Sequence, residues 1–133
     1  MALQFSAAAR NAALDAIETA IGASPTLELR TGAAPANCAA ADTGTVVATT
    51  ALPADFMAAA AAGAKALSGT WQDIAADAAG TVGHFRIKQG ATCHAQGSVT
   101  ITGGGGDITL DNNVLAVGQQ VTITAFTLTA GGA

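Results

Sequence analysis

The amino-acid pattern changes at Pro25, and the second pattern occupies most of the chain. After Pro25, short alternating runs rich in Thr and Val are separated by Gly, Pro, Asn and Asp, which is typical of consecutive β-strands. Seven such runs in about 105 residues match the strand density of a sandwich. The sequence therefore predicts one mainly β domain over residues 1–133, an antiparallel β-sandwich of the jelly-roll type, with strands at residues 26–31, 45–52, 65–74, 81–88, 93–102, 107–110 and 120–129.

Before Pro25, residues 6–21 have the pattern of one α-helix. Ser6 is suited to cap its N-terminus and Gly22 to end it. The amphipathic spacing predicts that the helix docks through its apolar side, either on the sheet of the same chain, which we favour, or on another subunit. The apolar side is Ala9, Ala13, Leu14, Ile17, Ala20 and Ile21, and the polar stripe is Asn11, Asp15, Glu18 and Gly22.

A β-hairpin is predicted where residues 89–92 join residues 85–88 to residues 93–96, because a four-residue loop containing Gly suits such a turn. In that register Lys88 faces Cys93 and Ile87 faces His94. Alternation then places the side chains in two sets, with Phe85 and Ile87 in the core and His84, Arg86 and Lys88 on a solvated face.

Two segments have ambiguous patterns. Residues 54–67 are rich in Ala and favour a helix, but Gly63 interrupts them within a β-like region, so we predict strand and loop there. In residues 120–129 the apolar parity changes, which requires a bulge or twist near Ala125 or a strand buried on both faces. The glycine run at residues 103–106 predicts a tight or mobile connection between two strands.

Composition limits the partners of the chain. Ala and Gly make up 51 of the 133 residues, so the core is expected to be thin. A net charge of −4 with only five Lys and Arg residues argues against nucleic acid, since phosphate binding needs clustered cations. The sequence contains neither a strongly apolar run of about 18 residues nor a secretory pattern, so we expect neither membrane insertion nor export.

Cys38 and Cys93 are too few and too far apart in the sequence to suggest a disulfide scaffold. We expect both to be free thiols packed among small residues.

No catalytic constellation is indicated, because the nine acidic residues are scattered and no Ser-His-Asp or Cys-His spacing occurs. His84, Cys93 and His94 are the best metal candidates, but the hairpin register separates His94 from the other two. The glycine run lacks the Lys-Ser/Thr ending of a phosphate loop, and Asp107, Asp111 and Asn112 lack the calcium-loop spacing. We therefore predict no enzyme, no cofactor, no metal and no site residues.

Trp71 is the only Trp, and the chain has no Tyr. We expect Trp71 in the core, with an interface anchor as the alternative. A sugar-stacking platform would have to be built from this indole and four Phe side chains, which makes carbohydrate recognition a weak possibility.

Several segments together resemble a family of small virion proteins of tailed bacteriophages. The likeness extends over nearly the whole chain, and its motifs are structural and moderately specific. The segments are Ala8-Ala9-Arg10-Asn11-Ala12-Ala13-Leu14-Asp15-Ala16-Ile17, Leu27-Glu28-Leu29-Arg30-Thr31-Gly32, Gly80-Thr81-Val82-Gly83-His84-Phe85-Arg86-Ile87-Lys88, Gly97-Ser98-Val99-Thr100, Asp107-Ile108-Thr109-Leu110-Asp111-Asn112 and residues 118–129.

The resemblance implies a capsid decoration or cement protein that binds the major capsid protein on the outside of the head and stabilises it. It also implies self-association as a dimer or trimer, and assembly in the host cytoplasm. The alternative is a tail or fibre-associated structural or adaptor protein, with carbohydrate binding as a further possibility. The interface itself is not predicted, and the first side chains to truncate would be Phe56, Trp71, Leu14 and Ile17.

Overall fold

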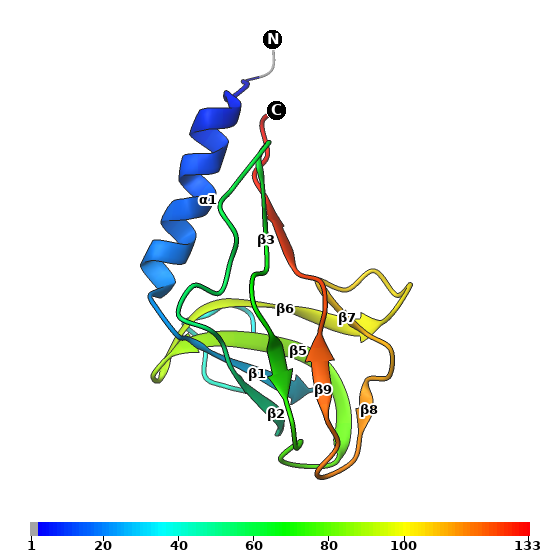
Figure 1. Cartoon of the computed structure of the whole chain (residues 1–133). Coiled ribbons are helices and arrows are strands. Elements are labelled where there is room, and N and C mark those ends of the chain that lie inside the picture. Colours follow the sequence, from blue (N-terminus) through cyan, green and yellow to red (C-terminus); the bar gives the residue numbers. More distant parts are fainter. Residues whose placement is uncertain (1–2) are drawn as a thin grey trace.

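The computed structural model describes residues 3–133, which form one helix and ten strands (Figure 1). The helix is α1 (Ala7–Ile21). The strands are β1 (Thr26–Thr31), β2 (Val46–Ala51), β3 (Ala64–Ala66), β4 (Trp71–Asp73), β5 (Gly80–Gln89), β6 (Thr92–Ile101), β7 (Ile108–Leu110), β8 (Val114–Leu115), β9 (Val121–Ile123) and β10 (Thr127–Thr129). The fold is mainly β with one N-terminal helix, as the sequence predicts.

The largest sheet has the order β2-β1-β5-β6-β7, and β8 pairs with β5. Two smaller sheets, β4 with β9 and β10 with β3, are both antiparallel. In the large sheet β1 pairs with β5 so that Leu27 lies opposite Ile87 and Leu29 opposite Phe85. This register places these four apolar side chains on one face of the sheet, and that face packs against the rest of the hydrophobic core.

Aromatic side chains connect the large sheet to the β4/β9 ribbon. Trp71 lies with its ring centroid 5.5 Å from Phe126, and Phe126 meets Phe85 edge-on at 5.6 Å. Trp71 is fully buried, which confirms its predicted core position, and its indole N–H donates to the carbonyl of Phe56 at 3.1 Å. These rings supply the volume that the many alanines cannot.

Several predicted strands are present with altered ends. Residues 26–31 form β1 as predicted, whereas residues 65–74 and 120–129 are each divided into two short strands. The second division falls at residues 124–126, where the parity change predicts an irregularity.

Residues 54–67 contain no α-helix, as predicted. Strand β8 follows a turn in which Val114 N–H donates to Asn112 Oδ1 at 3.0 Å. The sequence pattern does not predict β8, because this strand is only two residues long.

The β5/β6 hairpin has a bulge that the sequence analysis did not place. Lys88 faces Cys93 as predicted, but Ile87 faces Ala95 rather than His94, because the register shifts between Ile87 and Lys88. His94 is exposed and does not lie opposite Ile87. The bulge therefore removes His94 from the ladder.

The large sheet is mixed rather than purely antiparallel, because β7 runs parallel to β6, with Val99 beside Ile108. To start a strand parallel to β6, residues 102–107 must first turn back along β6 to the level of Val99 and then turn forward again. The glycine run permits this path: Gly103 and Gly105 have positive φ values of 89° and 80°, and a Cβ on Gly106 would lie 2.8 Å from the backbone nitrogen of Thr100.

Helix α1 stands at one side of the molecule and extends beyond the large sheet, next to the β3/β10 ribbon, with both chain ends at the same pole (Figure 1). Ser6 caps it by accepting from Ala9 N–H at 3.1 Å, and Gly22 ends it with φ 88°. Within residues 3–133, no helix has the length and apolar character needed to cross a membrane.

Candidate functional site

Two regions concentrate the chemistry-bearing side chains. The first is the charge cluster, defined as Glu28, Arg30, Asp42, Arg86 and Lys88. It forms because β1 and β5 pair with Glu28 opposite Arg86, so their charged side chains share the face away from the core. Asp42 comes from a loop and binds all three cations, with nitrogen–oxygen distances of 3.2 Å to Arg30, 2.5 Å to Arg86 and 2.5 Å to Lys88.

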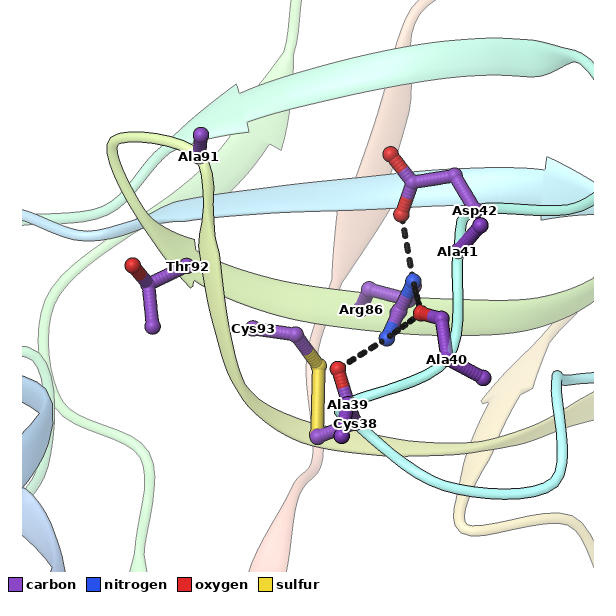
Figure 2. Close-up of a pocket in the computed structure, with 9 residues that line it drawn as sticks. All are labelled: Cys38, Ala39, Ala40, Ala41, Asp42, Arg86, Ala91, Thr92 and Cys93. Atoms are coloured by element: carbon purple, nitrogen blue, oxygen red, sulfur yellow. Dashed lines mark hydrogen bonds and ion pairs between the residues drawn. A yellow bond between two sulfur atoms is a disulfide. The ribbon is translucent and has the colours of Figure 1, made fainter.

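The loop that carries Asp42, residues 33–44, covers this face and is named the clasp loop. Arg86 donates to the carbonyl oxygens of Cys38 at 2.8 Å and Ala40 at 3.2 Å (Figure 2). Gln96 donates to the carbonyl oxygen of Pro35 at 2.7 Å. The predicted solvated face is therefore wrong: the side chain of Arg86 is only 2% exposed and that of Lys88 10%. Alternation correctly separates the two faces of β5 but cannot show that a distant loop covers one of them.

Cys38 and Cys93 form a disulfide that ties the clasp loop to the start of β6 (Figure 2). The prediction of two free thiols is wrong. The pairing depends on the clasp loop folding back over β5, which brings together cysteines separated by 55 residues. No local pattern in the sequence encodes that approach.

Electrostatics in the charge cluster favour the ionised form of the Asp42 carboxylate. Hydrogen bonding from Lys88, together with Arg86, holds the pKa of Asp42 below its usual value of 3.8 despite partial burial. Glu28 adds contacts of 3.0 Å to both Arg30 and Lys88. The cluster thus contains three cations and two anions, all at least partly withdrawn from water.

The charge cluster offers little for catalysis. A cavity of about 600 Å³ lies beside it, lined by residues 38–42, Arg86 and residues 91–93, but the Arg86 N–H groups facing the loop already donate to protein oxygens. His84 is buried on the same strand face and contacts the carbonyl of Gly32 at 2.9 Å. Among residues 3–133, no group of three or more His, Cys, Asp or Glu side chains is placed to hold a metal ion.

The second region is α1, which polar contacts attach to the β3 end of the molecule. Lys65 of β3 is 2% exposed, and its Nζ contacts Asp15 and Glu18 at 2.7 Å each. Asn11 Oδ1 accepts from Gly63 N–H at 2.9 Å, and Asp15 Oδ1 accepts from Ala60 N–H at 3.2 Å. The helix is thus attached through its polar stripe as well as through part of the apolar side predicted to dock.

The pKa values of Asp15 and Lys65, which join α1 to β3, shift in opposite directions. Hydrogen bonding from Lys65 lowers the pKa of Asp15 below 3.8. Burial alone would lower the pKa of Lys65, but hydrogen bonds to Asp15 and Glu18 outweigh burial, and the pKa is raised above 10.5. Both groups are therefore charged across the neutral range.

Most of the predicted apolar side of α1 remains exposed. Leu14 and Ile21 are buried, but Ile17 is 42% exposed, and the neighbouring alanines also face solvent. We name this surface the outward face of α1. It contains no charged residue and consists of Ala8, Ala9, Ala12, Ala13, Ala16, Ile17 and Ala20.

Of the four residues first considered for truncation, only Ile17 is accessible, since Phe56, Trp71 and Leu14 are each 3% exposed or less. Phe5 is 50% exposed and is the only accessible aromatic side chain among the described residues. A sugar-stacking platform built on Trp71 is therefore not present.

Comparisons of the chain with protein-family models, with curated proteins and with solved structures found no match. The charge cluster and α1 are therefore the features of the molecule that bear on its function.

Proposed function

We propose that the protein is a non-enzymatic structural component of a tailed-phage virion, most specifically a decoration protein that binds the major capsid protein on the outside of the head. In this proposal α1 is the docking element. The body formed by the sheets is the rigid part that remains outside the shell.

The observation that carries the proposal is the orientation of α1. The helix uses Asn11, Asp15 and Glu18 to bind its own chain and leaves an uncharged face toward solvent. Helices in a monomeric protein usually place the apolar side inward and the charged side outward. In α1 the large side chains of Leu14 and Ile21 do pack inward, but the charged side also binds the chain itself, and a face of alanines and Ile17 stays exposed. An uncharged exposed face of this kind is expected of a helix that completes its packing on another protein.

The clasp loop supports use outside a cell. A disulfide persists in oxidising surroundings and is rare in a reducing cytoplasm. A virion protein is assembled in the cytoplasm and then used after release, where Cys38 and Cys93 can oxidise to the disulfide and stay paired. Weak contacts at each copy would suffice, because a lattice of identical sites multiplies modest affinities.

The test is co-sedimentation of the purified protein with phage heads that lack it, followed by counting copies per head and measuring the temperature at which heads burst. We expect saturable binding at a copy number commensurate with the capsid lattice and a raised burst temperature. Protein that stays in the supernatant at micromolar concentration would overturn the decoration proposal. The same assay on isolated tails would then test the alternative location.

A further inference from the structure

A groove lies between the N-terminal half of α1 and the C-terminal segment of the chain. It has a volume of about 280 Å³ and is lined by Phe5, Ala9, Arg10, Ala13, Ala130 and Gly131. The walls are fixed to each other, since Phe5 N–H donates to the carbonyl of Gly132 at 2.6 Å. This volume is at the lower end of the range for small-molecule sites, which is about 300 to 1,000 Å³. Its size and apolar lining suit part of a protein segment.

Arg10 is the only charged residue in this lining. Among the Lys and Arg side chains within residues 3–133, it is also the only one without an ion pair, since Arg30, Lys65, Arg86 and Lys88 all contact carboxylates. Its Nε is buried without a hydrogen-bond partner. The Arg10 residue as a whole is only partly buried, so an acceptor on a partner can reach the rest of its guanidinium and supply the ion pair that the chain itself does not provide.

The position of Arg10 is constrained by its surroundings. The guanidinium lies directly against Gly63, where a Cβ would leave it no room. Gly63 is itself held by Asn11 and by Ala130, whose N–H donates to the Gly63 carbonyl at 2.9 Å. Arg10 is therefore placed at the wall of the groove by packing rather than by an electrostatic partner.

We infer that this groove binds a segment of the partner protein that presents one carboxylate among small or apolar side chains. The carboxylate would accept hydrogen bonds from the Arg10 guanidinium, and the flanking residues would lie against Phe5, Ala9 and Ala13. An apolar lining with one unpaired cation is complementary to that chemistry. This inference rests on the proposed function, because it takes the partner to be the capsid shell protein, and it adds which chemical group on the shell is recognised.

The experiment compares Arg10→Gln and Arg10→Lys with wild type in the co-sedimentation assay on heads that lack the protein. Gln120→Glu is the matched control, since it changes the net charge by the same amount at an exposed position away from α1. We expect Arg10→Gln to weaken binding by tenfold or more, Arg10→Lys to weaken it less, and Gln120→Glu to stay within about twofold of wild type. Urea unfolding of each variant separates lost binding from lost folding. If Arg10→Gln unfolds, the comparison of Arg10→Lys with Gln120→Glu decides.

A photo-reactive residue placed at Ala9 identifies the bound segment directly. The expected product is a cross-link to a shell-protein peptide that contains Asp or Glu. A cross-linked peptide without an acidic residue, a cross-link to a second copy of this chain, or undiminished binding by folded Arg10 variants would overturn the inference while the proposed function stands. Absence of wild-type binding would overturn both.

Discussion

The clasp loop and α1 are both attached to the sheets by buried cations, but they differ in what they leave exposed. In the charge cluster, Asp42 and the loop carbonyls engage the cations, and a disulfide closes the loop over them. At α1, one buried cation, Lys65, holds the helix together with backbone hydrogen bonds from Ala60 and Gly63, and the outward face is left uncovered. The first arrangement confers stability and leaves little surface for recognition. The second attaches the helix and leaves one of its faces exposed.

Breaking the disulfide should produce the largest effect on the clasp loop. In the chain-entropy account, closing a loop of 55 residues stabilises the fold by about 4 kcal/mol. Reduction, or the double change Cys38→Ser with Cys93→Ser, should therefore lower the free energy of unfolding by about that amount in urea. The double variant should not respond to reductant. An oxidised wild type no more stable than the reduced one would show that the disulfide does not stabilise this loop.

Removing the shared carboxylate should have the next largest effect. Asp42→Asn leaves Arg30, Arg86 and Lys88 with Glu28 as the only anion in the charge cluster. We expect a loss of about 2–3 kcal/mol, below the value for a fully buried pair because the Asp42 side chain is 35% exposed. Asp55→Asn, at an exposed position, is the control. Equal unfolding curves for the two variants would contradict this role.

Acid should remove the difference in free energy of unfolding between wild type and Asp42→Asn. The pKa of Asp42 in the folded state is lowered below 3.8. Its contribution to the free energy of unfolding is therefore fully present above pH 3.8 and is lost as the pH falls through the lowered pKa. Urea unfolding should be measured for both proteins between pH 3 and pH 7. The free energies of unfolding of wild type and Asp42→Asn, plotted against pH, should converge on the acid side. A gap that stays constant down to the acid limit would contradict the assignment of Asp42 as an ionised partner.

At α1 the expected loss is smaller and local. Lys65→Met keeps an apolar stem but removes the hydrogen bonds to Asp15 and Glu18, which should cost about 1–2 kcal/mol because both carboxylates can reach water. Hydrogen exchange should become faster in α1 while β1 and β5 keep their protection. Uniformly faster exchange throughout the chain would instead place Lys65 in the global core.

The sequence predicts much of the fold where the signal is local. Helix residues 6–21 have a cap, a stop and a continuous pattern, and β1 has clear alternation, so both are placed within a residue of the structure. The bulge after Ile87 and the parallel β7 were missed, because each depends on where a distant segment lies.

The candidate site is less accessible to sequence reasoning. Arg86 and Lys88 have the spacing of a solvated pair, and only the folded clasp loop reveals their burial. The spacing of Asn11, Asp15 and Glu18 correctly places them on one side of α1, but it cannot show that Lys65 turns that side inward. The apolar spacing of Ile17 and the surrounding alanines is the one sequence signal for an exposed helix face, because such a side can dock on another subunit instead of on its own sheet.

The central claim, that α1 holds its outward face free for a partner, is tested most directly by Ile17→Arg with Ile74→Arg as its control. Both isoleucines are exposed, at 42% and 73%, and only Ile17 lies on α1. We predict that both variants fold with stabilities within about 0.5 kcal/mol of wild type, as surface substitutions usually do. We further predict that only Ile17→Arg fails to co-sediment with heads that lack the protein. Normal binding by Ile17→Arg, or equal loss by both variants, would contradict the account.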